Sequence, residues 1–497
     1  MLYTCTRDKS VRVTASKAIA DGISPDGGLY LPSEIPALSK KDFAELSTLS
    51  YKERAFRVLS LYLTDFSAEE LSSCIDGAYR AGKFTSDKIA PVVHYGGNEY
   101  ILELFGGPTC AFKDVALQIL PYLLTVSASK NIEDKEIVIL VATSGDTGKA
   151  ALEGFKNVPG TKILVFYPSD GVSMMQKLQM ATQEGANVGV AAIRGNFDDA
   201  QNGVKAIFTD KAILKKFEDN NLAFSSANSI NWGRLVPQIV YYVSAYCELL
   251  ASGAIKDGES INITVPTGNF GNILAAYYAM RMGVPVKKLI CASNKNRVLT
   301  DFLKTGVYDR KREFYATSSP SMDILISSNL ERLLFLLTDG DDARVRDWFS
   351  RLKSEGVYEV GDDVKQKLSA LFAAGSCDDE GTKKQIKDSF ENHNYLADTH
   401  TAVGLRVCGE YLSESGDTAV TLIAATANAY KFPAAVLEAL GGKTEGLDEF
   451  DMIGKLELLT GVKAPAQLLA LKSKPVRFSG VTEKENMADA VFSMLGI

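Results

Sequence analysis

Histidine is scarce in this chain, and the residue patterns by which proteins hold metals are missing. Only three histidines occur in 497 residues, and none forms an H-x-x-x-H pair. A zinc site built from histidines is therefore not expected, and we predict no metal. The seven cysteines are scattered without any C-x-x-C pair. An odd number without metal-ligand spacing indicates free thiols in a reducing compartment.

Long apolar runs and an excess of positive charge are also absent. No run of about eighteen apolar residues occurs, so no membrane span is expected. The first residues, MLYTCTRDKSVRV, lack the apolar core of a signal peptide. The net charge of -7 argues against nucleic acid or an anionic membrane as a partner. We therefore expect a cytoplasmic protein, and an anionic small-molecule substrate stays open because an acidic protein can carry a basic pocket.

What the chain does contain is a repeating pattern of apolar strands and helices. Residues 1 to about 95 resemble a small, mostly helical segment, and alternating strand and helix patterns begin at residue 98. Continuous apolar runs are typical of parallel strands covered on both faces, which predicts a doubly wound α/β architecture. Between about 320 and 395 only charged helical patterns are found, which predicts an inserted helical lobe. The strand-like runs are 136–143, 162–168, 187–193, 261–266, 287–293 and 421–426.

The first glycine-rich strand end follows the run 136–143 and reads TSGDTG. Small residues between a strand and a helix expose backbone N–H groups at the helix N-terminus, which makes an anion site. ATP binding is excluded, because Ala150 replaces the Ser or Thr of a P-loop and Thr143 stands in place of its first glycine. An ordinary α/β turn is the alternative interpretation.

Two further segments carry similar signals. The run 261–266 is followed by TGNFGN, a second candidate anion loop. The segment ELFGGPTCAFKD places Lys113 at the start of an apolar helix. Since helix N-termini favour anions, the helix dipole and the apolar neighbours should lower the pKa of this lysine. Such a lysine suits Schiff-base chemistry, and an ordinary surface lysine is the alternative.

Together and in this order, the three segments resemble the fold type II pyridoxal-phosphate enzymes, and more narrowly the threonine synthases. LFGGPTCAFKD resembles that family's Schiff-base motif, TSGDTG its substrate-carboxylate loop, and PTGNFGN its cofactor-phosphate loop. ISPDGGLYLP resembles its extra N-terminal domain. The resemblance implies that Lys113 holds pyridoxal 5'-phosphate and acts as the catalytic residue. It assigns the cofactor phosphate to Gly268, Asn269, Phe270, Gly271 and Asn272, and substrate contacts to Ser144, Asp146 and Thr147.

The resemblance also gives a meaning to the segment SANSINWGR, which precedes an apolar helix. Asn228, Ser229 and Arg234 can converge on one phosphate, for which a guanidinium is well shaped. They resemble the family's holder of the substrate phosphate, with Lys177 as a second cation. For Asn228 and Ser229 alone, helix capping is the alternative.

One more candidate lies at the end of the run 421–426. Thr426 resembles the hydroxyl partner of the cofactor ring nitrogen, which would leave the ring a milder electron sink than a carboxylate would. The following Asn428-Ala429-Tyr430 departs from the commoner His-Pro-Ala, and Asn272 stands where some members have Asp. His400, in DTHTAVGL, matches a family segment without an assigned role, and we expect a buried supporting histidine.

The resemblance implies three parts: an N-terminal domain (1–97), a large cofactor domain (98–128 and 245–497, with the helical insertion) and a small α/β domain (129–244). It implies conversion of O-phospho-L-homoserine and water into L-threonine and phosphate, by γ-elimination and addition of water at Cβ. A monomer is implied, with a homodimer as the alternative.

Two rival functions are another fold type II lyase, such as a serine/threonine dehydratase, and a non-catalytic protein that binds a phosphate ligand. The N-terminal domain and the candidate phosphate residues argue against the first rival, and Lys113 argues against the second.

Overall fold

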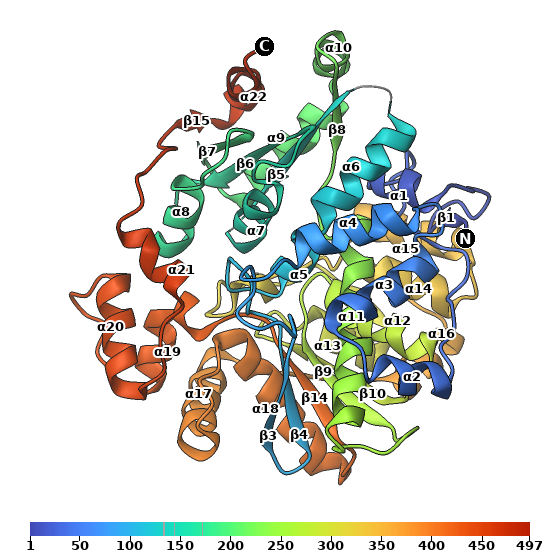
Figure 1. The fold of residues 1–497 in the computed structure, drawn as a ribbon, viewed down its shortest axis with the longest axis vertical. Coiled ribbons are helices and arrows are strands. Elements are labelled where there is room, and N and C mark those ends of the chain that lie inside the picture. Colours follow the sequence, from blue (N-terminus) through green and yellow to red (C-terminus); the bar gives the residue numbers. More distant parts are fainter. Residues whose placement is uncertain (133–134, 144, 171) are drawn as a thin grey trace.

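Two sheets, one large and one small, form the framework of the molecule (Figure 1). The computed structural model describes residues 1–132, 135–143, 145–170 and 172–497. Helices surround both sheets, and the N-terminal segment packs beside them. The predicted α/β architecture is confirmed by this arrangement.

The large sheet has six strands in the order β13-β10-β9-β14-β4-β3. All neighbours are parallel except β3 and β4, which form an antiparallel pair. Every residue of β9 and β14 is buried, as expected for continuous apolar runs covered on both faces. The strands are β3 Val92–Gly96, β4 Glu99–Glu103, β9 Ile261–Pro266, β10 Val286–Ser293, β13 Phe372–Ser376 and β14 Thr421–Ala425. The surrounding helices are α5 Lys113–Leu117, α6 Leu120–Asn131, α11 Trp232–Ala251, α12 Gly271–Met282, α13 Val298–Thr305 and α18 Thr399–Ser415.

The small sheet has five parallel strands in the order β15-β7-β6-β5-β8. It occupies the upper part of Figure 1, next to the C-terminus. Its strands are β5 Glu136–Ala142, β6 Thr161–Pro168, β7 Val188–Arg194, β8 Leu222–Ser225 and β15 Val481–Glu483. Its helices are α7 Asp146–Phe155, α8 Met174–Ala181, α9 Phe197–Thr209, α10 Lys211–Asp219 and α22 Met487–Leu495.

The N-terminal segment is mostly helical, as predicted, and packs against α6 and α11. Its apolar side chains join those of α11, α12 and the large sheet in one continuous core. Its elements are β1 Tyr3–Cys5, β2 Tyr30–Pro32, α1 Ala15–Asp21, α2 Lys40–Leu46, α3 Tyr51–Tyr62 and α4 Ala68–Ala78. The remaining elements are β11 Val307–Asp309, β12 Val357–Glu359, α14 Leu330–Leu337, α15 Asp342–Ser354, α16 Asp362–Leu371, α17 Asp379–His393, α19 Pro433–Ala439, α20 Glu449–Thr460, α21 Ala466–Leu469 and the short 3-10 turns η1 Pro320–Met322, η2 Ala429–Lys431, η3 Ala470–Lys472 and η4 Lys484–Asn486.

Three details of the predicted organisation are wrong. The stretch 320–395 contains strands as well as helices, and β13 pairs in parallel with β10 at the edge of the large sheet. Its sequence, FAAGS, follows α16 without a turn and carries small residues that do not show a strand pattern. β3 lies before residue 98, yet it belongs to the large sheet. β15 pairs with β7, so the end of the chain joins the small sheet and not the large domain.

Candidate active site

Lys113 is the first residue of α5, and the backbone before it is tied to the end of β14. The N–H of Phe112 donates to the carbonyl of Thr426 at 2.8 Å, and the N–H of Asn428 donates to that of Cys110 at 3.1 Å. These bonds bring the predicted lysine and the predicted ring partner to one pocket. The two segments are far apart in the sequence, so this placement comes from the parallel pairing of β4 with β14.

The amine of Lys113 is well shielded from water, with 11% of the side chain exposed. Its Nζ donates to Ser321 Oγ at 3.0 Å and lies 3.9 Å from Asp146 Oδ2. Burial lowers the pKa of Lys113 to about 8, because the charged form loses its hydration. The carboxylate of Asp146 works in the opposite direction, while the positive charges of Lys431 and Arg234 add to the lowering. The predicted direction is confirmed, with burial as its main cause.

The side chain of Thr143, which follows β5, bonds to the backbone at the start of α7. Its Oγ1 accepts from the N–H groups of Gly145 at 3.0 Å and Gly148 at 2.9 Å, so α7 starts directly at Asp146. Gly145 has a φ of 143°, a backbone angle that residues with a side chain rarely adopt. Ser144 lies outside the described residues, and Thr147 is half-buried in the first turn of α7.

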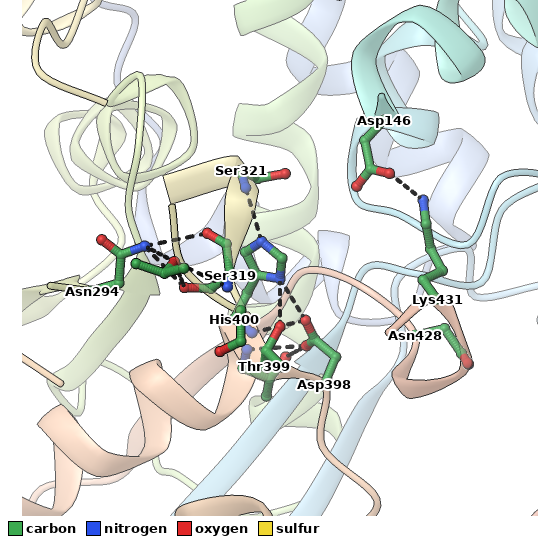
Figure 2. Close-up of polar contacts among 12 residues, drawn as sticks. Asp146, Asn294, Ser319, Ser321, Asp398, Thr399, His400, Asn428 and Lys431 are labelled. Carbon is green, nitrogen blue, oxygen red and sulfur yellow. Dashed lines mark hydrogen bonds and ion pairs between the residues drawn. The ribbon is translucent and has the colours of Figure 1, made fainter. Parts of the chain in front are cut away.

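Asp146 forms a buried ion pair that sequence reasoning missed. Lys431 Nζ donates to Asp146 Oδ1 at 2.7 Å (Figure 2). It also donates to the carbonyl of Thr109 at 3.0 Å. The two cations of Lys431 and Lys113 hold the pKa of the Asp146 carboxyl far below its usual range despite its burial. One carboxylate thus links the catalytic lysine candidate to a second lysine.

His400 supports the turn that contacts Lys113. Its Nε2 accepts the backbone N–H of Ser321 at 3.1 Å, and its Nδ1 donates to Asp398 Oδ2 at 2.8 Å (Figure 2). The acceptor role of Nε2 places the ring proton on Nδ1. Asn294 holds the same turn from the other side, by donating to Ser319 Oγ at 3.0 Å. His400 is 2% exposed, so the expectation of a buried supporting histidine is confirmed.

The loop after β9 has the geometry of an anion cradle. Phe270 has a φ of 63°, unusual for a residue with a bulky side chain, and α12 starts at Gly271. A Cβ at Gly271 would meet only ordinary van der Waals contacts, 3.5 Å from Asn329 Nδ2 and 3.9 Å from Gln238 Nε2. Backbone N–H groups at a helix start favour a phosphate. Gly268 is half-buried and Asn269 is exposed at the loop surface.

Asn272 gives the clearest sign that this cradle is built for an anion. Its Oδ1 accepts the hydroxyls of Tyr241 at 2.5 Å and Tyr242 at 2.6 Å. That fixes the amide, and the buried Nδ2 has no partner among the described residues. A buried donor without an acceptor costs stability unless a ligand accepts from it. A phosphate group fits this requirement, and an Asp at this position would supply no such donor.

Arg234 lies in the first turn of α11 and is 4% exposed. Its Nη1 donates to the carbonyl of Ala227 at 2.9 Å, while the buried Nε has no partner in the described part of the chain. Burial lowers the pKa of Arg234 to about 10. A buried guanidinium with free donors is suited to bind a phosphate. Asn228 is exposed and Ser229 half-buried on the segment before it, where Asn231 and not Asn228 caps the helix.

Comparisons with known proteins point to one family. The models of the threonine synthase N terminus, of pyridoxal-phosphate dependent enzymes and of the threonine synthase C-terminal region match residues 2–79, 90–426 and 401–491. Threonine synthase of Saccharomyces cerevisiae is 36% identical, with 91% of each chain covered. The chain belongs to the threonine synthase family.

Human threonine synthase-like 1 is 41% identical over 86% of this chain but only 58% of its own length. This chain therefore spans less than two thirds of some curated relatives. A solved pyridoxal-phosphate-bound threonine synthase from Brucella melitensis has a TM-score of 0.88 and 36% identity, and covers 100% of this chain and 99% of its own.

Within the threonine synthase family, the segment Asn428-Ala429-Tyr430 is the departure that we noted in the sequence. Asn428 caps η2, which contains the other two residues, and its Oδ1 accepts the N–H of Tyr430 at 3.0 Å. The Tyr430 hydroxyl donates to the carbonyl of Val462 at 2.5 Å. These side chains thus shape the turn that carries Lys431. A lysine inside the apolar stretch AYKFPAA was the signal that could have revealed its burial.

Lys177 does not share the pocket of Lys113. It is exposed on α8 and lines a separate cavity with Tyr167, Met174 and Phe478.

No helix in the described residues is long and apolar enough to cross a membrane. Those residues also contain no cluster of three or more potential metal ligands. All seven cysteines are buried free thiols.

Proposed function

We propose that this protein is a threonine synthase, which converts O-phospho-L-homoserine and water into L-threonine and phosphate with pyridoxal 5'-phosphate as cofactor. The observation that carries the proposal is the position of Lys113, a buried lysine with a lowered pKa that shares one pocket with Asp146 and Thr426. Family membership supports the same reaction, because relatives that match over nine tenths of both chains bear this name.

The cofactor fits the residues present. Lys113 would hold it covalently, the loop Gly268–Asn272 would bind its phosphate, and Thr426 would face its ring nitrogen. When bound, pyridoxal phosphate supplies an aldehyde for amines and a conjugated ring that accepts the electrons left by a departing proton.

Lys113 is placed to handle the protons of the reaction. With a pKa of about 8 it titrates near neutral pH, so it can take a proton from the substrate Cα and return one. Ser321, held by His400, keeps the amine in position through its hydroxyl. Net, the Cγ–O bond breaks and phosphate leaves, one hydrogen is lost from Cβ and one is gained at Cγ, and the hydroxyl of water bonds to Cβ while its remaining proton goes to the phosphate.

Substrate selection rests on charged groups at the two ends of the molecule. Arg234, with Asn228 and Ser229 nearby in sequence, would bind the phosphate, because the buried guanidinium has donors to spare. The start of α7, with Asp146 and Thr147, would receive the substrate carboxylate and amine. Lys177 stays a candidate for the phosphate only if α8 approaches the site, since it lines another cavity. We further propose a monomer that works in the cytoplasm, which the seven free thiols favour.

The test is an assay of the purified protein loaded with pyridoxal phosphate. We expect phosphate and threonine in equal amounts from O-phospho-L-homoserine. Ketoacid and ammonia from serine or threonine, without phosphate release from O-phospho-L-homoserine, would instead identify a dehydratase. Binding without any turnover would identify a phosphate-ligand binding protein.

A further inference from the structure

A buried segment at the start of α14 touches both candidate phosphate sites and the N-terminal segment. It comprises residues 327–332, and we call it the clamp segment. Ser327, Asn329 and Arg332 are at most 2% exposed. None of them has a part in the chemistry described above, so their polar groups need another explanation.

On one side the clamp segment holds the cofactor loop. Ser327 Oγ donates to the carbonyl of Gly268 at 2.8 Å. The backbone N–H and the Nδ2 of Asn329 both donate to the carbonyl of Asn269, each at 3.1 Å. In a planar trans peptide the carbonyl and the N–H of the same unit point in opposite directions. The N–H groups of Asn269 and Phe270 therefore face away from the clamp segment, where an anion can accept from them.

On the other side the clamp segment holds the loop before α11. Asn329 Nδ2 donates to the carbonyl of Ser229 at 3.1 Å, and Arg332 Nη2 donates to that of Ile230 at 2.5 Å. Arg332 Nη1 donates to Asn329 Oδ1 at 2.5 Å, which fixes the orientation of the amide. One amide, oriented by one guanidinium, thus bonds to both loops.

The N-terminal segment fixes the clamp segment from two directions. Arg332 Nε donates to the carbonyl of Tyr30, in β2, at 2.8 Å. The buried carboxylate of Glu331 accepts from Arg7 Nε at 2.8 Å and from Thr6 Oγ1 at 2.6 Å, just after β1. The position of Asn329 therefore depends on contacts with the first strands of the chain.

We propose that Asn329 and Arg332 are positioning residues that set the spacing between the cofactor-phosphate loop and the substrate-phosphate site, with the N-terminal segment as their anchor. The inference rests on the proposed function, because it takes the two loops as phosphate sites. Packing alone does not account for Arg332. Burial lowers the pKa of Arg332 to about 10, and an apolar side chain would occupy the same space without that cost.

The test compares Asn329→Asp and Arg332→Met with Arg54→Met in the holoenzyme. Asn329→Asp keeps the volume and the acceptor for Arg332 but removes the Nδ2 donor to both loops, so that only the backbone N–H still bonds to Asn269. Arg54 is a matched control, because it is a buried arginine that joins the N-terminal segment to Ser244 in α11, at 2.9 Å, and contacts neither loop. For each protein we would measure the affinity for pyridoxal phosphate by reconstitution, kcat and KM for O-phospho-L-homoserine, inhibition by inorganic phosphate, and the Tm.

For Asn329→Asp and Arg332→Met we expect about tenfold or greater losses in affinity for pyridoxal phosphate and for inorganic phosphate, with a matching rise in KM. Arg54→Met should lower the Tm but leave these affinities within about twofold of wild type. Equal affinities in all three variants at similar Tm would overturn the proposal and leave a structural role only. If Arg332→Met does not fold, Arg332→Lys, which keeps the charge without the forked donors, takes its place under the same criteria. Absence of phosphate release by the wild type would refute the proposed function separately, because cofactor and inorganic-phosphate binding still test the clamp segment.

Discussion

Replacing Arg234 by leucine should separate substrate recognition from folding more sharply than any other change. The guanidinium is 4% exposed, and one of its donors is committed to the carbonyl of Ala227. Its other donors have no partner among the described residues, so they can bind a phosphate. Each charge-assisted hydrogen bond contributes about 1.5–3 kcal/mol. Loss of two such bonds predicts a fall in kcat/KM of at least about a hundredfold, since about 1.4 kcal/mol corresponds to a factor of ten.

Unlike kcat/KM, the free energy of unfolding of the ligand-free protein should not fall when Arg234 is replaced by leucine. The lowered pKa of Arg234 means that burial penalises its charge, so the folded state carries a desolvation cost. Leucine removes this cost of several kcal/mol per ion and loses one charge-assisted hydrogen bond to Ala227, worth about 1.5–3 kcal/mol. We therefore expect Arg234→Leu to be at least as stable as the wild type in thermal unfolding.

The assay is steady-state phosphate release from O-phospho-L-homoserine, with the visible absorption band of the lysine-bound cofactor recorded on the same sample. Arg234→Leu should keep that band, because the residue is assigned to the substrate and not to the cofactor. Arg54→Leu is a matched control at a buried arginine outside the site. Wild-type kcat/KM in Arg234→Leu, or loss of the band, would refute the assignment and reopen the dehydratase alternative.

Four further predictions concern Lys113 and the residues assigned to the cofactor. Lys113→Ala should lose the visible band and nearly all turnover, and borohydride reduction of the wild type should label Lys113 in peptide mapping; a label on another lysine contradicts this. Because the folded pKa of Lys113 lies near 8 and the unfolded value near 10.5, the unfolded state binds more protons between them. The unfolding free energy of the ligand-free protein should then rise with pH in that window, and less steeply in Lys113→Met. Gly271→Val should weaken cofactor binding far more than it lowers the Tm. The added Cβ meets only ordinary van der Waals contacts, whereas the two methyl groups beyond it would occupy the space of the cofactor phosphate. Normal cofactor affinity in this variant would show that the loop does not bind the phosphate. Thr426→Asp should favour a protonated ring and shift the products toward ketoacid, whereas an unchanged spectrum and product ratio would mean that Thr426 does not face the ring nitrogen.

Sequence patterns predict the central strands of this fold well, because buried parallel strands are continuous apolar runs. Each of the six predicted runs coincides with a strand to within about a residue at its ends. The pattern fails where burial is partial: β13 is an edge strand of small residues, and β15 has three residues of which two are exposed. Short edge strands are defined by their hydrogen-bonding partners, which local sequence does not reveal.

The candidate site shows the same division. Glycine-rich turns and the lysine at a helix start are local signals, so Lys113 and both loops could be predicted. Lys431 could not, because its role depends on the distant Asp146, to which it pairs at 2.7 Å. The clamp segment likewise has no local signature, since Asn329 acquires its meaning only from two carbonyls contributed by other parts of the chain.

The most direct test of the proposed reaction follows the oxygen atom of water. The holoenzyme is given O-phospho-L-homoserine in water enriched in heavy oxygen, and the products are analysed by mass spectrometry. Cleavage of the Cγ–O bond with addition of water at Cβ predicts threonine that carries the heavy oxygen and phosphate that does not. Heavy oxygen in the phosphate, with homoserine as the other product, would show hydrolysis at phosphorus and contradict the proposed function.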